Sequence, residues 1–228
     1  EMLVGIPPAS IIVDPKQEGD DFPFKGMANV GITFKLCEEL LGSSISKSLK
    51  NSFLELTALG TIADMVPQID ENQKIIEEGL RSLKNTFRPA LRAFLDLLGE
   101  GRIFEGSLQK IISALNASES INFQNESYFL LTNSSLPKCK EMAQRLINES
   151  QQKQFKVKEI TQEVERRIMQ KQDASVIFEG DPSWKLTLAG SVASIISQKY
   201  EKPAFIFKKM DEESCGSVRN PRNTNSVE

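Results

Sequence analysis

One aspartate is a candidate for metal chemistry, because Asp64 follows an apolar helical run and precedes Pro67 by three residues. That position predicts a carboxylate at the end of a helix, where a side chain can project into a cleft. Hard divalent cations such as Mn²⁺ prefer carboxylate oxygens, and two-metal phosphoesterases need several of them converging on one site. A single aspartate at a helix end is more often a cap or a surface residue, so the interpretation of Asp64 depends on its neighbours.

A second group of residues has the types needed to hold a phosphate, namely Gly216, Ser217 and Arg219. The glycine permits close approach, the serine supplies a hydroxyl and a backbone N–H, and the arginine can bind a phosphate through two hydrogen bonds. Three nearby cations could add a local basic patch: Lys208, Lys209 and Arg222. Taken alone, such a cluster is more often a solvated strand end.

The elements that must position Asp64 are mostly helical. A strand is expected over 10–13. Asp70 with Gln73 three residues later has the pattern of a capping box, whereas Pro89 suits the first turn of a helix and Gly99 its end. Apolar spacing predicts helices over 30–41, 44–59, 70–83, 89–98, and shorter ones around 106–115 and 125–132.

A long helix is predicted over 137–172. After Pro137 this stretch has no proline and no glycine, and its apolar residues are spaced three to four apart. Its middle is wholly polar, a pattern typical of a helix that bridges two domains across solvent. At 1.5 Å per residue such a helix extends roughly 54 Å. Two helices broken near Ser150 are the alternative. Beyond it, a small α/β domain is predicted from strands at 174–178, 204–207 and 216–219 and a helix at 188–200.

Composition narrows the class of protein. Hydrophobic residues make up 39% and charged residues 26%, as in ordinary globular proteins, and no apolar run approaches the ~20 residues of a membrane span. The net charge of −3 gives no basic excess, so nucleic-acid binding would depend on a local patch or on metal ions. Cys37, Cys139 and Cys215 form no CxxC pair, which favours reduced cysteines over a zinc site. The chain has no histidine, and we expect it to be a segment of a longer protein.

The residues around Asp64 resemble the RecJ-type single-strand exonucleases of the DHH phosphoesterase superfamily. Residues 58–67, with Glu71-Asn72 and Gly79-Leu80 after them, are similar to the last acidic motif of those enzymes. Four earlier segments are similar to the part that follows their Asp-His-His signature: 7–9, 13–16, 22–25 and 31–36. The resemblance implies that this signature lies a few residues before Glu1. It also implies that Asp64 is one ligand of a site for two Mn²⁺ or Mg²⁺ ions, with most ligands outside this chain.

The second half resembles the same proteins. Residues 115–117 are similar to a Leu-Asn-Ala segment, residues 184–194 to a segment of the DHH-associated domain, and residues 216–219 to a Gly-Ser-x-Arg element that contacts the nucleic-acid backbone. Trp184 would stack on a base, or else cover the core of a small domain. The nucleic-acid-binding residues that the resemblance implies are Gly216, Ser217, Arg219, Asn116, Trp184 and Lys185.

The resemblance therefore implies an α/β fold in three parts: the mostly helical C-terminal part of a DHH domain (1–135), a connector helix (136–172) and a small α/β DHH-associated domain (173–228). It implies a cytoplasmic, metal-dependent 5′-to-3′ exonuclease acting on single-stranded DNA in repair and recombination, with no membrane association. Repair proteins or single-strand-binding proteins are the implied protein partners. With one expected metal ligand, Asp64, the chain alone is predicted to be inactive.

Two alternatives stay open. The first is a non-catalytic nucleic-acid-binding or scaffold relative, because Lys185, Thr187 and Ile195 stand where histidine, glycine and arginine are usual and Ser120 falls where a basic residue is expected. The second is a DHH phosphodiesterase for short oligonucleotides or cyclic dinucleotides. Those proteins generally lack a long connector, so residues 137–172 argue against that reading.

Overall fold

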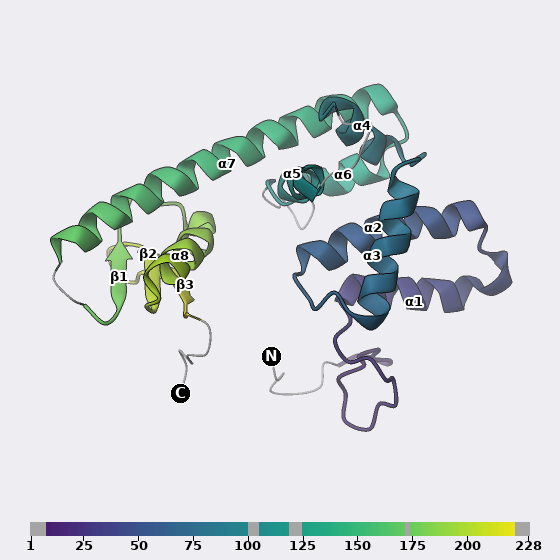
Figure 1. Ribbon diagram of the computed structural model, residues 1–228, viewed down its shortest axis with the longest axis horizontal. Coiled ribbons are helices and arrows are strands. Elements are labelled where there is room, and N and C mark those ends of the chain that lie inside the picture. Colours follow the sequence, from purple (N-terminus) through teal and green to yellow (C-terminus); the bar gives the residue numbers. More distant parts are fainter. Residues whose placement is uncertain (1–7, 100–104, 119–124, 172–173, 222–228) are drawn as a thin grey trace. The chain divides into compact units, whose positions relative to one another are not determined.

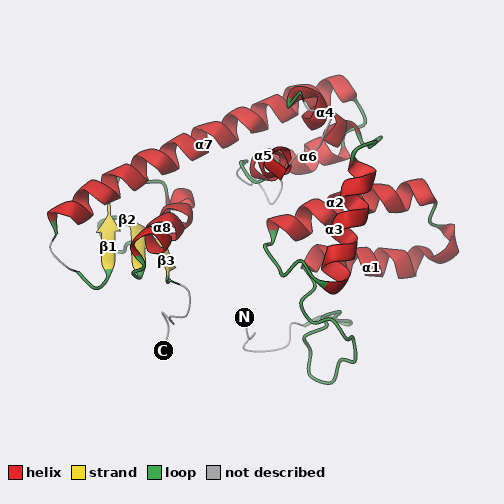
Figure 2. Cartoon of the chain, in the orientation of Figure 1, coloured by secondary structure: helices red, strands yellow, loops and turns green. Residues whose placement is uncertain are grey.

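The computed structural model describes residues 8–99, 105–118, 125–171 and 174–221. The chain divides into two compact units, Glu1–Ile147 and Asn148–Glu228. Figure 1 shows the elements in chain order, and Figure 2 shows that strands occur only near the C-terminal end of the described chain. None of the described helices is long and apolar enough to cross a membrane.

The first unit is helical in its described part. Its helices are α1 (Asn29–Leu41), η1 (Gly42–Ser44), α2 (Lys47–Ala63), α3 (Asp70–Leu83), α4 (Pro89–Leu97), α5 (Glu105–Leu115) and α6 (Glu126–Thr132). Its main core joins residues from α2 to α6 and from the first turns of the long helix that follows. The fully buried members include Leu91, Phe94, Ile111, Leu130 and Leu146.

Helices α2 and α3 pack closely because Gly79 of α3 has no side chain where it faces α2. A Cβ added at Gly79 would lie 2.4 Å from the carbonyl oxygen of Leu54 and 2.5 Å from Cβ of Ala58, both on α2. A buried carboxylate adds a second link, since Glu55 of α2 accepts hydrogen bonds from Ser82 and Thr86, each at 2.6 Å. The position of α2 relative to α3 is therefore fixed by both sterics and hydrogen bonds.

Both predicted ends of α4 are confirmed. Pro89 begins α4, and Gly99 follows its last turn with a φ of 69°. The capping box at Asp70 is wrong: Ile69 holds the N-cap position without a side-chain hydrogen bond, and Gln73 donates to Glu77 at 2.9 Å. Gln73 is exposed beside a carboxylate one turn further on, so its amide bonds along the helix instead of back to the cap.

The strand expected over 10–13 is also wrong. These residues form no strand, and Ile11 and Val13 are 82% and 55% exposed. A strand is held by a neighbouring strand, and none of the described strands pairs with this segment. The apolar run therefore remains an irregular loop that leads to α1.

The long helix is confirmed as continuous. Helix α7 runs from Leu136 to Gln170 as a single helix of 35 residues and passes through Ser150 without a break. Its first turns contribute Cys139, Ala143 and Leu146 to the core of the first unit. Its last turns contribute Val164 to the core of the second unit. The two apolar ends of the helix thus pack into two separate cores, and the polar residues lie between them.

The second unit is a three-stranded sheet packed against helices. Strand β1 (Ile177–Gly180) pairs in parallel with β2 (Ala204–Lys208), and β2 pairs in antiparallel with β3 (Cys215–Arg219). Helix α8 (Leu186–Tyr200) connects β1 to β2 and buries Val192, Ala193 and Ile196. The predicted α/β class is confirmed: the described chain is mostly helical with one small sheet.

Candidate functional site

Asp64 is the C-cap residue of α2. Its backbone N–H donates to the carbonyl oxygen of Gly60 at 3.0 Å, and its side chain is exposed, with no hydrogen bond or ion pair to a described residue. The next residue, Met65, has a φ of 55°, which ends the helix in a left-handed turn. The helix end therefore presents the Asp64 carboxylate with both oxygens available.

The loop after Asp64 is held in place by Asn72. The Asn72 side chain is fully buried, and its Nδ2 donates to the carbonyl oxygens of Pro67 and Gly26, each at 2.9 Å. One amide thus ties the loop to the first turn of α3 and to the segment before α1. Together with the close packing at Gly79, this bond orders the segment that carries Asp64.

The donor set of the first unit fits a hard divalent cation in type but not in number. A carboxylate such as Asp64 suits Mg²⁺ or Mn²⁺. Among the described residues, however, no group of three or more histidine, cysteine, aspartate or glutamate side chains lies close enough to hold a metal ion. Asp64 is therefore an accessible carboxylate, and the described residues gather no cluster of further ligands around it.

The structure brings Ser217, Arg219 and Gly190 together in the second unit. Nη1 of Arg219 donates to Oγ of Ser217 at 2.9 Å and to the backbone oxygen of Val218 at 2.8 Å. A Cβ added at Gly190 of α8 would lie 3.5 Å from Oγ of Ser217 and 3.6 Å from Nη2 of Arg219. The added Cβ would make ordinary van der Waals contacts with this pair, so the glycine leaves space for about a methyl group between α8 and the pair.

The register of the sheet explains this arrangement. Ser217 lies opposite Ile206 and Arg219 lies opposite Ala204, and both partners on β2 are buried. Side chains opposite each other share a face of the sheet, so Ser217 and Arg219 lie on the face that packs against the helices. Because β3 is the last strand in the sheet order, Arg219 remains exposed at the sheet edge.

Gly216 has a structural role that the sequence did not indicate. An added Cβ would lie 2.3 Å from the carbonyl oxygen of Ile206 and 2.4 Å from Cβ of Phe207. The neighbouring strand therefore requires a glycine at this position. Its contact with a phosphate stays a prediction.

Trp184 and Lys185 lie in the loop between β1 and α8. The indole of Trp184 is 7% exposed and belongs to the core of the second unit, with the Arg167 guanidinium carbon 5.2 Å from its ring centroid. This burial favours the core-covering role over stacking on a base, which stays a prediction. Lys185 is exposed at the N-cap of α8, where its side chain makes no cap hydrogen bond.

The same loop is anchored by an ion pair that the sequence did not predict. Arg167 of α7 donates to Asp181 at 2.8 Å, to Glu163 at 2.9 Å and to the backbone oxygen of Gly180 at 3.2 Å. The Arg167 hydrogen bond, with those from Ser183, lowers the pKa of Asp181 from 3.8 to about 2. Asp181 directly follows a strand, which is the one local signal that could have drawn attention to it.

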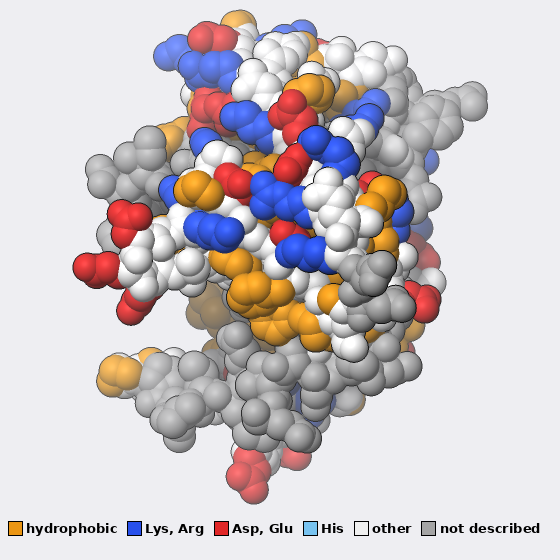
Figure 3. All heavy atoms as spheres, turned by 90° about the vertical axis from the view of Figure 1, so that its left-hand side faces the viewer, with side chains coloured by type: hydrophobic (Ala, Val, Ile, Leu, Met, Phe, Trp, Pro, Cys, Tyr) orange, Lys and Arg blue, Asp and Glu red, His pale blue; other side chains and the backbone are white. Residues whose placement is uncertain are grey.

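The remaining predicted residues are distributed over both units. Asn116, at the end of α5, is exposed and belongs to the first unit, whereas Ser217 and Arg219 belong to the second. Lys208 and Lys209 lie at the end of β2. Figure 3 shows a face where Lys, Arg, Asp and Glu side chains are mixed beside a hydrophobic patch, which agrees with the lack of a basic excess. Ser120 and Arg222 lie outside the described residues.

Comparison with curated proteins finds RecJ exonucleases. The chain is 33% identical over 231 residues to the single-stranded-DNA-specific exonuclease RecJ of Bacillus subtilis, which covers 98% of this chain and 28% of that protein. It is 25% identical to the RecJ of Haemophilus influenzae, over 91% of this chain and 39% of that protein. No protein-family profile matches. The chain thus spans roughly a third of the length of these relatives.

Comparison with solved structures finds the same fold. An exonuclease RecJ bound to manganese matches with a TM-score of 0.77 and 22% identity, over 97% of this chain and 55% of that one. RecJ of Thermus thermophilus in complex with Mg²⁺ matches with a TM-score of 0.68 and 23% identity, over 82% of this chain and 30% of that one. A crystal structure of the Thermus thermophilus protein in complex with Mn²⁺ matches equally well. The expected α/β fold class is therefore confirmed, and the division into three parts stays a prediction.

Proposed function

We propose that this chain is part of a metal-dependent exonuclease that hydrolyses single-stranded DNA from the 5′ end in repair and recombination. The chain is similar to RecJ exonucleases over nearly its whole length. The observation that carries this proposal is the 33% identity with a RecJ exonuclease over 98% of this chain, a span that includes both Asp64 and the Ser217–Arg219 pair. We also propose a cytoplasmic location, as the resemblance implies.

Asp64 is proposed as one carboxylate ligand of a metal site. A carboxylate ligand suits Mg²⁺ or Mn²⁺. Bound cations would activate a water molecule and neutralise the charge that develops on the phosphate. The role of this chain is to hold one oxygen at a fixed place, for which the Asn72 anchor and the close α2–α3 packing are suited. Because the described residues supply no further cluster of ligands, we propose that the chain alone does not cleave DNA.

Ser217 and Arg219 are proposed to bind the backbone of the strand. The guanidinium has further N–H groups beyond the one that donates to Ser217, and a guanidinium can bind a phosphate through two parallel hydrogen bonds. Gly190 adds no side chain against the pair, where a Cβ would already be in contact. Lys185, Asn116 and Gly216 are proposed as weaker contributors, since all three are exposed.

The test compares binding with cleavage. The 228-residue chain is mixed with 5′-labelled single-stranded DNA and Mn²⁺, and strand retention and strand length are measured together. We expect retention without shortening. A longer protein that includes this chain and the upstream motifs is expected to shorten the strand from its 5′ end. If the 228-residue chain alone shortened the strand, the proposal that most metal ligands lie outside this chain would be wrong.

A non-catalytic relative is the second candidate. The departures at Lys185, Thr187 and Ile195 favour it, because these residues differ in charge or size from those usual in RecJ proteins. The same experiment separates the two candidates. If the longer protein retains single strands but cleaves none in Mg²⁺ or Mn²⁺, it is a non-catalytic scaffold relative.

A further inference from the structure

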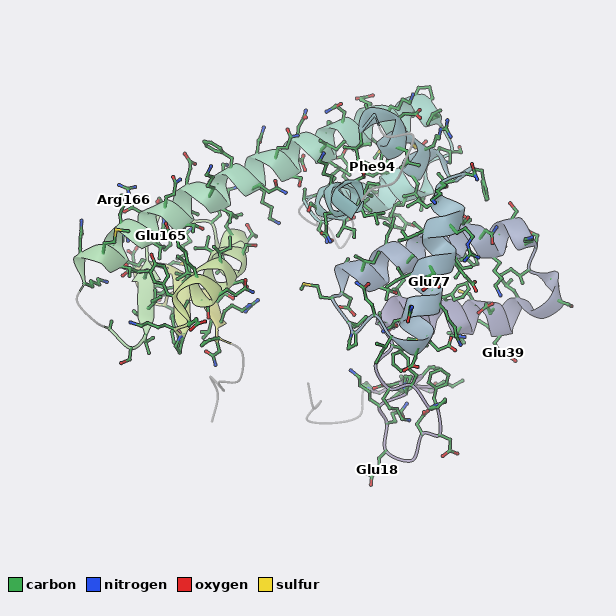
Figure 4. The ribbon with its side chains drawn as sticks, viewed as in Figure 1. Glu18, Glu39, Glu77, Phe94, Glu165 and Arg166 are labelled. Carbon is green, nitrogen blue, oxygen red and sulfur yellow. The ribbon has the colours of Figure 1, made fainter. Side chains whose placement is uncertain are left out.

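A hollow on the first unit begins beside the loop that carries Asp64. Ile62 and Gln68, which flank Asp64 in the sequence, both line it, and residues of α3 and α5 form the rest of its wall. Its volume is about 620 Å³, within the ~300–1,000 Å³ typical of ligand sites. Figure 4 labels Glu77, one of its lining residues, on α3.

The floor of the hollow is apolar. Ile76 and Leu108 are buried, and Leu80 is half-buried beside them. Leu108 belongs to the main core of the unit, and Ile62 and Leu80 pack against that core. The floor is therefore a rigid apolar surface, against which the flat face of a nucleobase can pack.

The rim carries two cations without a partner among the described residues. Arg81 and Lys84 of the C-terminal end of α3 are exposed, and neither side chain forms a hydrogen bond or ion pair with that part of the chain. The two amides Gln68 and Gln109 also line the hollow, and each can both donate and accept hydrogen bonds. Within the described chain, Glu77 is the single carboxylate of the lining.

We propose that this hollow, lined by Ile62, Gln68, Leu80, Arg81, Lys84 and Gln109, binds a segment of single-stranded DNA beside the loop that follows Asp64. The cations contact phosphates, the floor packs against a base, and the amides contact base edges. The proposal rests on the proposed function, because that function brings a strand to Asp64. An acidic peptide would also suit the two cations, but the apolar floor, the two amides and the loop shared with Asp64 favour the strand.

The test measures binding of a labelled oligothymidine to the 228-residue chain in EDTA, so that no cleavage occurs. Arg81→Ala/Lys84→Ala is expected to weaken binding by about tenfold. It is also expected to reduce the slope of log K against log salt by about 1.4, since each phosphate contact on a single strand contributes about 0.7. Glu77→Gln is expected to strengthen binding, because it removes a negative charge from the rim. The matched control is Lys74→Ala, an exposed cation of the same helix outside the hollow, which should change affinity by less than about twofold.

The outcomes separate this proposal from the proposed function. If Arg81→Ala/Lys84→Ala binds like Lys74→Ala while Arg219→Ala binds poorly, the proposal for the hollow is wrong and the proposed function stands. If the unaltered chain binds no oligothymidine at all, both are wrong. Binding of an acidic peptide that depends on Arg81 and Lys84, with unchanged oligothymidine binding, would assign the hollow to a protein segment instead. Circular dichroism of each variant confirms that it is folded.

Discussion

The Arg219 guanidinium donates to the hydroxyl of Ser217 at 2.9 Å, between two residues of the edge strand β3. This bond fixes the direction of a long, otherwise mobile side chain. It leaves the remaining N–H groups of the guanidinium for a ligand. A phosphate bound here would meet an arginine that has already lost part of its conformational freedom.

Removal of this arginine tests its role in strand binding. Arg219→Ala is expected to weaken single-stranded DNA binding by about tenfold or more, because a hydrogen bond to a charged group contributes about 1.5–3 kcal/mol. Arg219→Lys should restore only part of the loss, since an ammonium cannot bind a phosphate in the two-bond geometry. Fluorescence anisotropy measures the affinities. Lys199→Ala, at an exposed cation that pairs with Glu165 on α7, is the control and should bind normally.

Gly190 provides a steric test of the same site. Gly190→Ala is expected to be tolerated, because its Cβ would lie at ordinary contact distances from Ser217 and Arg219. Gly190→Leu should block the space beside the pair and reduce DNA affinity while the chain stays folded. Affinity and thermal unfolding are measured for both variants. Equal DNA affinity of the leucine and glycine forms would show that no ligand occupies this space.

Gly79 tests the packing that positions Asp64. Gly79→Ala is expected to lower the free energy of unfolding by about 1–3 kcal/mol, because the new methyl group would overlap the backbone of Leu54. Urea denaturation measures the change. Gly106→Ala on α5 is the matched control, since nothing lies within 4 Å of its Cβ. That control should be neutral or stabilising by up to about 1 kcal/mol, as alanine is the better helix former.

The lowered pKa of Asp181 makes the free energy of unfolding depend on pH. The pKa of its carboxyl in the folded chain is about 2, below its ordinary value of 3.8, because Arg167 and Ser183 donate hydrogen bonds to the charged form. A lowered pKa means that the stabilisation is fully present above pH 3.8 and is lost as pH falls toward about 2. Unfolding measured between about pH 5 and pH 2 should show this loss. Asp181→Asn should be less stable at the upper end of that range and should lose less stability across it.

Local patterns in the sequence were enough to predict most of the helices and the presence of a small sheet. The apolar spacing on either side of Ser150 predicted α7, because both ends of that helix pack into a core. The strand expected over 10–13 failed, since strand formation depends on a partner that a local pattern cannot supply. The capping box at Asp70 failed for a related reason: Gln73 had a nearer partner on its own helix.

The contacts that build the candidate sites are mostly non-local, so the sequence predicted only their members. Asp64 could be chosen from its motif, but its anchor through Asn72 to Gly26 joins residues 46 positions apart. The proximity of Gly190 to Ser217 depends on the packing of α8 on the sheet. Trp184 shows the limit of residue type as a guide, because the same indole suits a base or a core and only its 7% exposure favours the core.

The most direct test of the central claim compares two nearby aspartates. Asp64→Asn and Asp70→Asn are made in a longer protein in which the Asp-His-His segment that the resemblance implies precedes this chain, and degradation of 5′-labelled single-stranded DNA is followed with Mn²⁺. Both side chains are exposed, and Asp70 lies on the first turn of α3 outside the proposed metal site. We predict that Asp64→Asn loses at least about a hundredfold in rate with normal strand binding, whereas Asp70→Asn keeps its rate. Equal rates for the two variants would contradict the assignment of Asp64 as a metal ligand.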